Sequence, residues 1–522
     1  MIRGEGSPLR RCVIARAVLA RVGAARVTSS AMRPLVRRFA RLTVRRWSVT
    51  VIAATVVPVI VVGQTPSDTV LSAATRAAID SAARSILAAN GAPSASVAVV
   101  AGGRIVYRQA YGSARLAPPA AAQPDMRYAV GSVSKQFTAA AVLLLAQEGK
   151  LSLSDPVSRY VPGLTRGDEV TVRELLSHTS GYQDYWPQDY VMPSMLIPTT
   201  ADQIITGWAK KPLDFDPGTQ WQYSNTNYVI AGRIIEKLAG MPLMQFLQTR
   251  IFAPLGMQSI ADVNASRLGE TDAIGYYRHA MGPPRPAPKE AAGWLFAAGE
   301  LAMTATDLAQ WDISIIDRRL LSPAWYDTLT AEVKLKNGGD TQYALGIVVG
   351  HEGGHRVWEH SGEVSGFTSE NIVLPDERAA VVVLTNQDAN NAASQIGQFV
   401  ARRLAPAGST QMVPGDDRVA ASARTILTEL QQGRLQRALF TDNANAYFTD
   451  EAIHDYASSL APFGAPRQFC QVARDERGGM VFRGFTAVFA GHAVTVSTYQ
   501  MADGKLEQYL VVPARAGASC PS

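Results

Sequence analysis

Apolar and polar residues between positions 73 and 111 follow two different periods. Over residues 73–89 the apolar positions recur with the spacing of an amphipathic helix. Residues 95–101 and 104–111 are instead rich in β-branched and other apolar side chains, and Gly102-Gly103 lies between them. A glycine pair between two such runs is typical of a tight turn. The pattern therefore predicts a helix followed by a β-hairpin.

The rest of the first 405 residues predicts further helices and strands. Residues 132–149 repeat apolar side chains with helical spacing and end at a glycine, which predicts a helix. Further on, short runs rich in Val, Ile, Thr and aromatic residues are separated by Gly, Pro and Asp, which is typical of antiparallel strands. These runs cover 342–349, 355–360, 366–374 and 378–385, and a helical pattern over 390–404 follows them. We expect the N-terminal hairpin and these strands to share one sheet, with helices on its faces.

The composition changes near residues 405–417, where Pro, Gly, Ser and Asp become frequent. Such a stretch is typical of a linker between domains. Beyond it, helical segments come first and alternating runs follow at 467–475, 478–488, 492–500 and 506–513. We therefore predict a main domain over 76–405, a linker over 406–417 and a small α+β domain over 418–522.

The first 63 residues differ from the rest of the chain in charge. They hold 12 of the 50 basic residues and one of the 44 acidic residues. Basic residues gather over 33–46, and an uncharged apolar run over 47–63 follows them. This order is the pattern of a secretory signal peptide, although an uncleaved run of this length is also near the lower limit for a membrane anchor. We predict a leader over 1–63, with a signal peptide or an N-terminal anchor, and a polar linker over 64–75.

The leader predicts where the protein is located, and the charge of the rest of the chain indicates which partners it can bind. An exported protein, periplasmic or secreted, is expected, with membrane association through residues 47–63 if that run is not removed. The net charge of +6 would favour a nucleic-acid partner, but without the leader the chain holds 38 basic and 43 acidic residues. An acidic chain does not attract a phosphate backbone, and we therefore expect no nucleic-acid partner.

The sequence Gly-Ser-Val-Ser-Lys at 131–135 marks the start of a predicted helix. On that helix Ser132 and Lys135 share a face, and the free backbone N–H groups of the first turn surround Ser132. A serine hydroxyl is a poor nucleophile unless a neighbour takes its proton, and a lysine whose neutral form is favoured can do so. Alone, Ser-x-x-Lys also occurs by chance, with Ser132 as a helix cap and Lys135 as a solvated charge.

Tyr-Ser-Asn at 223–225 follows a turn segment at 215–219. From an extended loop, Tyr223 and Asn225 can point the same way. A phenol beside an ammonium group loses its proton more readily and can carry a proton between nucleophile and leaving group. Asn225 can hydrogen-bond both Lys135 and a substrate amide. The alternative is an ordinary turn.

His360, Ser361 and Gly362 lie at the end of a predicted strand, and Glu363 follows them. A strand beside the nucleophile can offer a backbone N–H group to a developing oxyanion, and the N–H groups of Ser132 and Glu363 would form such a pair. His360 could hold Tyr223 or meet a substrate carboxylate. The alternative for His360 is a purely structural role at the strand end.

The three motifs, in this order, resemble those of the penicillin-recognising serine hydrolases, which include class C β-lactamases, D,D-peptidases, D-aminopeptidases and related esterases. That family carries Ser-x-x-Lys, then Tyr-x-Asn, then Lys/His-x-Gly on a sheet strand. The sequences around the motifs are also similar, at 172–181, 221–228, 253–257 and 298–311. The resemblance covers roughly residues 75–405, and the joint occurrence of the motifs is specific.

The resemblance implies an α/β (α+β) β-lactamase-like fold, with an antiparallel sheet flanked by helices and a mostly helical lobe. It implies acyl transfer to Ser132 from a small-molecule or peptide substrate with an amide or ester bond, and no metal or organic cofactor. Lys135 and Tyr223 would move the proton, and the substrate would be bound by Asn225, His360, Ser361, Gly362 and Glu363. A D,D-peptidase, D-aminopeptidase or β-lactamase-related activity fits. The alternatives are a carboxylesterase of the same fold and a catalytically silent penicillin-binding or sensor protein.

His360 departs from the pattern of class C β-lactamases, which typically carry lysine at this position. A permanent cation holds the carboxylate of a β-lactam more strongly than a titratable histidine does. Efficient β-lactam hydrolysis is therefore not expected, whereas peptidase and esterase activity remain open.

Two features outside these motifs leave alternatives open. His351 to His355 match the zinc pattern His-Glu-x-x-His, but that pattern needs a helix, and the glycine pair inside it favours a hairpin turn and no metal site. The C-terminal domain weakly resembles the cone-shaped nuclear-transport-factor type, and its role is either ligand binding or packing. Its cysteines, Cys470 and Cys520, could pair in an oxidising compartment.

Overall fold

The computed structural model describes residues 71–352, 354–405, 417–477, 480–515 and 517–520. The predicted leader over 1–63, most of the linker over 64–75 and nearly all of the linker over 406–417 lie outside these residues. Among the helices that are described, none is both long and apolar enough to cross a membrane.

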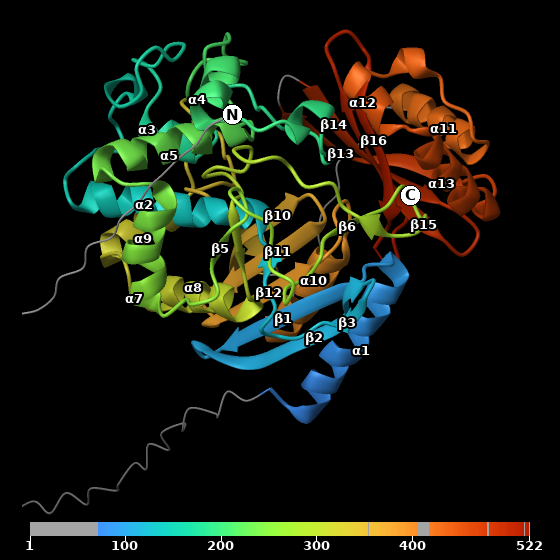
Figure 1. Ribbon diagram of the computed structural model, residues 1–522, viewed down its shortest axis with the longest axis horizontal. Coiled ribbons are helices and arrows are strands. Elements are labelled where there is room, and N and C mark those ends of the chain that lie inside the picture. The colour runs from blue at the N-terminus through green and yellow to red at the C-terminus, as the bar shows by residue number, and fades with distance from the viewer. Residues whose placement is uncertain (1–70, 353, 406–416, 478–479, 516, 521–522) are drawn as a thin grey trace, which may run out of the picture. The chain divides into compact units, whose positions relative to one another are not determined.

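A seven-stranded antiparallel sheet forms the centre of the main domain (Figure 1). Its strands lie in the order β3 (Pro119–Ala121), β2 (Arg104–Leu116), β1 (Ser94–Ala101), β12 (Ala379–Thr385), β11 (Phe367–Leu374), β10 (His355–Val364) and β9 (Val348–Glu352). Val97 of β1 pairs with Gln109 of β2 on one side and with Val383 of β12 on the other. The predicted hairpin and the later strands therefore share one sheet, as expected.

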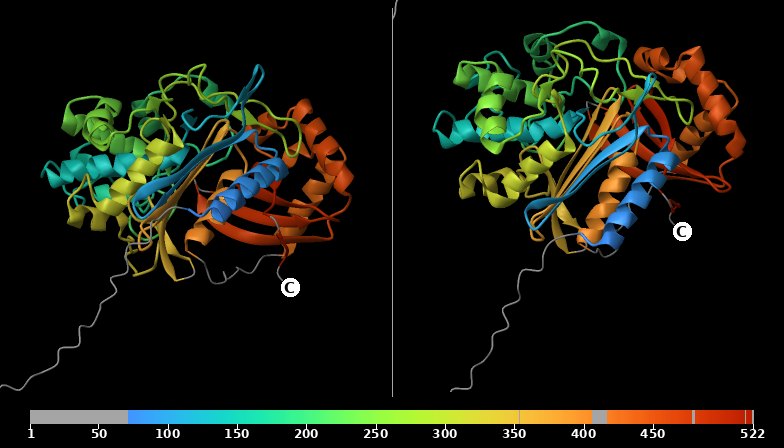
Figure 2. Two further views of the ribbon diagram at one scale, coloured as in Figure 1. Left: turned by 90° about the horizontal axis from the view of Figure 1, so that it is seen from below. Right: turned by 60° about the horizontal axis from the view of Figure 1, so that its bottom comes forward.

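Helices cover both faces of this sheet. One face is covered by α1 (Ala73–Asn90) and α10 (Ala392–Leu404), which pack side by side (Figure 2). The other side holds the helical lobe, formed by α2 (Ser134–Gln147), α3 (Val172–Leu176), α4 (Ala201–Ile204), α5 (Asn225–Ala239), α6 (Leu243–Leu247), α7 (Ala253–Leu255), α8 (Ala305–Asp317) and α9 (Pro323–Thr330). Short strands join this lobe: β4 (Tyr128–Ala129), β5 (Ala261–Asp262) and β8 (Leu301–Met303) in one sheet, β6 (Tyr276–Tyr277) and β7 (Arg285–Pro286) in another.

The central strands β1 and β12 are buried along nearly their whole length because both faces of the sheet are covered. Val97 and Val383 pack with α1 and α10, whereas Ala98 and Val382 belong to the core on the side of α2 and α8. Successive side chains of a strand point to opposite faces. A strand covered on both faces therefore does not alternate between apolar and polar residues, and the few polar residues of β1 and β12 are small and buried.

Near Ser132 and Lys135, the structure differs from two of the predicted elements. The strand predicted over 342–349 is wrong over most of its length, because β9 begins only at Val348 and residues 341–347 form a turn. In this turn Gly346 has a φ of 77°, and a Cβ there would lie 2.9 Å from the carbonyl oxygen of Lys135. The helix predicted from Ser132 begins instead as a 3₁₀ turn over Gly131–Val133, and α2 starts at Ser134.

The C-terminal domain is a four-stranded antiparallel sheet with helices packed on it. The strands β13 (Gln468–Arg477), β14 (Met480–Val488), β15 (Ala493–Gln500) and β16 (Leu506–Pro513) lie in sequence order, preceded by α11 (Asp417–Gln431), α12 (Asp442–Tyr447) and α13 (Asp450–Leu460). Cys470 and Cys520 form a disulfide, with their Cα atoms 5.7 Å apart. The α+β character is confirmed, and the assignment to the nuclear-transport-factor type stays a prediction.

Candidate active site

Two glycines bring strand β10 against the turn that carries Ser132. Gly131 has a φ of 52°, and a Cβ there would lie 2.6 Å from the backbone nitrogen of Glu363. At Gly362 a Cβ would lie 2.0 Å from the carbonyl oxygen of Val130 and 3.0 Å from the backbone nitrogen of Ser132. Side chains larger than glycine would therefore push the strand away. This close approach places the backbone nitrogen of Glu363 next to the turn that carries Ser132.

Lys135 lies directly beneath Ser132 and is fully buried. Its Nζ donates to Ser132 Oγ at 2.9 Å, to Asn225 Oδ1 at 2.8 Å and to the carbonyl oxygen of Ala298 at 2.7 Å. Burial lowers the pKa of Lys135 well below its ordinary value, the charge of Asp184 opposes this shift, and Arg477 adds to it. The three acceptors match the ammonium form, while burial favours the neutral amine, so this group is poised to exchange a proton.

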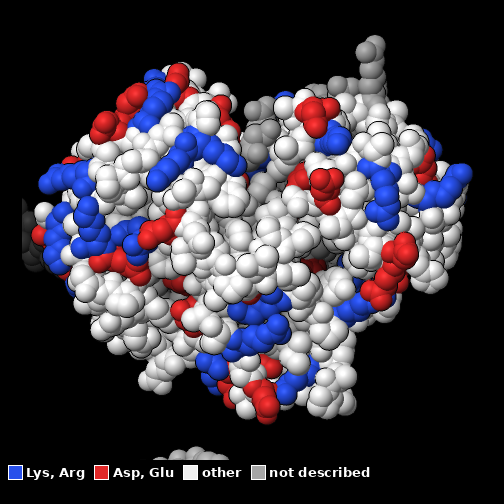
Figure 3. Space-filling model, turned by 45° about the horizontal axis from the view of Figure 1, so that its top comes forward, with Lys and Arg blue, Asp and Glu red and all other residues white. Residues whose placement is uncertain are grey.

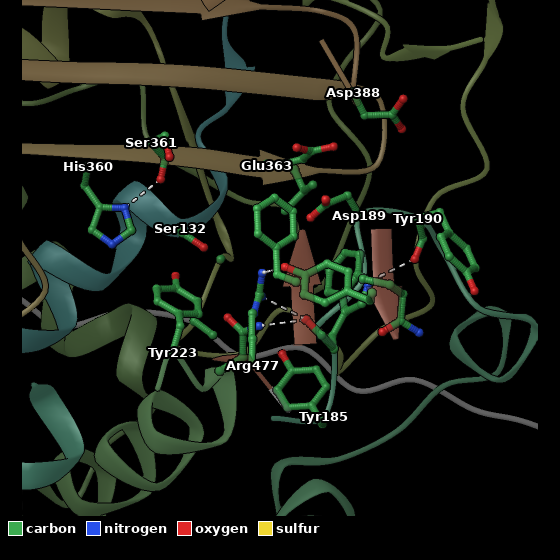
Figure 4. A pocket seen from close by; sticks show the side chains of 18 of the residues that line it. Ser132, Tyr185, Asp189, Tyr190, Tyr223, His360, Ser361, Glu363, Asp388 and Arg477 are labelled. Atoms are coloured by element: carbon green, nitrogen blue, oxygen red, sulfur yellow. Dashed lines mark hydrogen bonds between the residues drawn. The ribbon is translucent and has the colours of Figure 1, made fainter. Parts of the chain in front are cut away.

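The hydroxyl of Tyr223 is buried and points towards Ser132 (Figure 4). Burial raises the pKa of Tyr223, whereas the charge of Arg477 and the hydroxyl of Ser132 lower it. Two cations flank the phenol ring: Lys135 Nζ lies 4.9 Å from the ring centroid, and the guanidinium carbon of Arg477 lies 4.8 Å from it. The ring of His178 packs against the phenol at 4.2 Å between centroids. The phenol is therefore held in place on several sides beside Ser132.

Asn225 is the first residue of α5, and its polar atoms already have partners within the protein. Its Oδ1 accepts from Lys135, and its Nδ2 donates to Asp184 Oδ1 and to the carbonyl oxygen of Trp186, both at 3.1 Å. The predicted bond between Asn225 and Lys135 is thus present. The amide hydrogens that were expected to hold a substrate are instead directed at Asp184 and Trp186.

His360 lies in the same site and is a neutral side chain. Its Nδ1 donates to the carbonyl oxygen of Ser361 at 2.6 Å, so its Nε2 accepts from the hydroxyl of Tyr343 at 2.8 Å. Burial lowers the pKa of His360 to about 4. Its ring centroid lies 6.2 Å from that of Tyr223, and both ring nitrogens are engaged elsewhere. From the sequence we expected His360 to hold Tyr223 or to meet a substrate carboxylate. In this arrangement neither of its ring nitrogens is free for such a contact.

A cavity of about 390 Å³ opens beside Ser132, and side chains of both domains line it. The main domain contributes Ser132, Tyr185, Trp186, Tyr223, His360 and Ser361, and the C-terminal domain contributes Asp475, Arg477, Phe482 and Tyr499. Of the aromatic residues that precede α4, Tyr185 and Trp186 line the cavity, whereas Tyr182 is buried and donates to the carbonyl oxygen of Thr165.

The end of the cavity away from His360 is acidic. Asp189, Glu363 and Asp388 line it, and Figure 4 shows their carboxyl groups on one side of the cavity. Burial and then the charges of the other two carboxylates raise the pKa of Glu363 well above its ordinary value. Burial likewise raises the pKa of Asp388 to about 7 and also raises that of Asp189. Three crowded carboxyl groups create a strong preference for a cation, unlike the outer face in Figure 3, where charges of both signs are mixed.

The zinc pattern does not form a metal site. His351 and His355 lie on the paired strands β9 and β10 rather than on a helix, and His355 Nδ1 contacts Glu377. Within the described part of the chain, no group of three or more His, Cys, Asp and Glu side chains is arranged to hold a metal ion.

Sequence reasoning missed the charged residues that surround the predicted motifs. Asp184, Asp189 and Asp388 lie in loops without a recognisable pattern, and Arg477 lies 345 residues beyond Ser132, in the other domain. Only the charged side chains themselves, within loops rich in aromatic residues, could have drawn attention to Asp184 and Asp189.

The chain is similar to several known proteins. It is 28% identical over 314 residues to penicillin-binding protein 4* of Bacillus subtilis, which covers 56% of this chain and 68% of that protein. It is 30% identical over 302 residues to the D-aminopeptidase of Brucella canis, covering 57% of each. A D-stereospecific amidohydrolase from Streptomyces superposes with a TM-score of 0.55 at 28% identity, over 64% of this chain and 99% of that one.

The alignment with the D-aminopeptidase spans little more than half of that protein's length. The family model described as Beta-lactamase matches residues 79–405, which is more than half of the chain. The protein therefore belongs to the Beta-lactamase family and is a serine hydrolase of that family.

Proposed function

We propose that the protein hydrolyses amides or short peptides of D-amino acids that carry a free amino group. The observation that supports this most is the acidic wall of Asp189, Glu363 and Asp388 in the cavity of Ser132. A bound ammonium group relieves the crowding of these carboxyl groups and lowers their raised pKa values, whereas the carboxylate of a penicillin or of a D,D-peptidase substrate adds to it. The similarity to a D-aminopeptidase and to a D-stereospecific amidohydrolase supports the same substrate class.

The reaction we propose is acyl transfer through Ser132. Ser132 Oγ attacks the amide carbon while its proton passes to Lys135 Nζ, 2.9 Å away. The backbone N–H groups of Ser132 and Glu363 stabilise the oxyanion. The hydroxyl of Tyr223 gives its proton to the leaving nitrogen as the C–N bond breaks, and regains a proton from Lys135. Water then hydrolyses the acyl-enzyme by the reverse proton path.

The experiment compares substrates that differ only in charge or handedness. D-alanine p-nitroanilide should be cleaved by the wild type and not by Ser132→Ala. Acetylation of its amino group should lower kcat/KM at least about tenfold, because the cation is lost. The L-isomer should also be slower. Equal rates for the free and the acetylated amine would contradict the proposal, and rapid turnover of a penicillin or of p-nitrophenyl acetate alone would favour a β-lactamase or an esterase.

We also propose that the protein is exported through its leader. The basic segment 33–46 followed by the apolar run 47–63 supports this, and so does the Cys470–Cys520 disulfide, because disulfides persist in oxidising compartments. Mass spectrometry of the protein expressed in a bacterium identifies its N-terminus and so distinguishes a cleaved signal peptide from a retained anchor. A chain beginning near Gln64 indicates a cleaved signal, and a full-length chain in the membrane fraction indicates an anchor.

A further inference from the structure

The C-terminal domain reaches the active site through the last residue of β13. Arg477 Nε donates to Asp184 Oδ2 at 3.0 Å, and its second terminal nitrogen donates to the carbonyl oxygen of Trp186 at 3.1 Å. Asp184 is fully buried in the main domain, and the Arg477 side chain is 21% exposed. A buried ion pair of this kind has to be complete, because removing one partner leaves an uncompensated charge.

This ion pair continues as a chain of hydrogen bonds to the nucleophile. Asp184 Oδ1 accepts from the backbone nitrogen of Asn225 at 3.0 Å and from its Nδ2 at 3.1 Å. Asn225 Oδ1 accepts from Lys135, and Lys135 donates to Ser132. The position of the Lys135 amine is therefore tied, through two intermediate residues, to an arginine of the other domain.

The same arginine provides a permanent positive charge at the site. Its guanidinium lies against the ring of Tyr223, while the neutral His360 occupies the place at which class C β-lactamases typically carry lysine. The charge of Arg477 lowers the pKa of both Tyr223 and Lys135. It thereby favours the neutral amine of Lys135, which can accept the proton of Ser132, and makes the hydroxyl of Tyr223 a better proton donor.

The C-terminal domain also contacts the loop that carries Asp189, one of the three residues of the acidic wall. Gln508 of β16 accepts from the backbone nitrogen of Asp189 at 2.7 Å and donates to its Oδ2 at 3.0 Å. The hydroxyl of Tyr190 donates to the carbonyl oxygen of Glu507 at 2.9 Å. Both the proton-transfer residues and the cavity wall thus depend on this domain.

We propose that Arg477 is a positioning residue of the active site, and that the C-terminal domain serves to place its positive charge beside Tyr223 and Lys135. This inference rests on the proposed role of Ser132 as nucleophile, but not on the identity of the substrate. The domain is then a part of the hydrolase site rather than a separate binding module.

The test measures acylation of Ser132 itself, so that it does not depend on the natural substrate. The full chain without its leader is treated with an alkyl fluorophosphonate, and the labelling rate is followed by intact mass between pH 6 and 10. The variants are Arg477→Gln, which removes the charge, and Arg477→Lys, which retains it. Arg467→Gln, at an exposed arginine of the same domain, is the matched control, and thermal unfolding checks that each variant is folded.

The expected result is a shift of the pH profile. Without the positive charge, Lys135 and Tyr223 hold their protons to higher pH, so the rising limb for Arg477→Gln should move up by about one pH unit. Labelling should then fall about tenfold at pH 7 and recover towards pH 10. Arg477→Lys should keep the limb within about 0.3 units, and Arg467→Gln should match the wild type.

The groups around Tyr223 make the direction of the shift specific. They are Lys135 from α2, His178 and Asp184 from loops, His360 from β10, Arg477 from β13 and Tyr499 from β15, together with the buried phenols of Tyr185, Tyr228 and Tyr343. Asp184→Asn removes the only negative charge among them, so it should move the limb to lower pH, the opposite direction. Merely loosening the structure would not produce shifts of opposite sign.

Several outcomes would overturn the proposal, and one concerns the nucleophile instead. If Arg477→Gln is labelled at the wild-type rate and the rising limb of its pH profile does not move, the proposed role of the charge is contradicted. The same holds if the rising limb of Arg477→Lys moves as far as that of Arg477→Gln. If Arg477→Gln does not fold, the lysine variant alone decides by the same criterion. An unchanged labelling rate together with a higher KM for carboxylate-bearing substrates would make Arg477 a substrate ligand. Labelling that persists in Ser132→Ala refutes the nucleophile and not Arg477.

Discussion

The two ends of the active-site cavity are lined by different ionisable side chains: basic ones near Ser132 and acidic ones at the other end. At the end near Ser132, the amine of Lys135 and the guanidinium of Arg477 lie beside Tyr223, and Asp184 pairs with Arg477. At the other end Glu363 and Asp388 crowd together with Asp189. Positive charge lowers the pKa of a nearby proton acceptor, whereas burial and neighbouring carboxylates raise the pKa of Glu363 and Asp388 and favour the approach of a cation. The first end is thus suited to chemistry and the second to holding a cation of the substrate.

The largest effect is expected from removing the nucleophile at the cationic end. Ser132→Ala should lower kcat at least about 1,000-fold while KM for D-alanine p-nitroanilide changes little, because the acidic end is intact. Steady-state kinetics with a chromogenic leaving group measure both constants. A variant that retained a tenth of the activity would assign the chemistry to another residue.

The acidic end should respond in the complementary way. Glu363→Gln combined with Asp388→Asn should raise KM for D-alanine p-nitroanilide about tenfold or more and leave fluorophosphonate labelling of Ser132 near the wild-type rate. The acetylated substrate serves as the control, since it has no cation to lose. If both substrates lost activity equally, the acidic wall would not be the ammonium site.

A smaller effect should follow when a cation is added where the family typically has one. His360→Lys should increase acylation by a penicillin about fivefold, because a permanent charge attracts its carboxylate. His360→Gln is the neutral control. Equal penicillin labelling in both variants would show that the charge at this position does not select the substrate.

The smallest effect concerns stability and follows from the raised pKa of Asp388. A carboxyl whose pKa is higher in the folded chain, here about 7 against its ordinary 3.8, contributes stability below pH 4, and this is lost as the pH rises through 7. Asp388→Asn should therefore increase the free energy of unfolding at pH 8 and change it by almost nothing at pH 4. Urea unfolding at both pH values measures it. An equal change at both pH values would trace the effect to packing.

Some of the structure follows from local sequence alone. The helix over 73–89, the hairpin, three of the four later strands and the strands of the C-terminal domain have periods that local patterns reveal. The strand predicted over 342–349 failed because its apolar residues are buried in a turn beneath Lys135 rather than in the sheet. A buried turn and a buried strand are both rich in apolar residues, so the sequence pattern cannot distinguish one from the other.

The sequence by itself determined which residues approach one another through short motifs: Ser132 with Lys135, and Tyr223 with Asn225. Helical spacing fixes the first pair, and one intervening residue on a loop fixes the second. Only the tertiary structure decided that His360 is neutral, that three carboxylates share one wall and that Arg477 enters the site from the other domain. Charge depends on burial and on neighbours brought from hundreds of residues away, and neither is encoded in a local pattern.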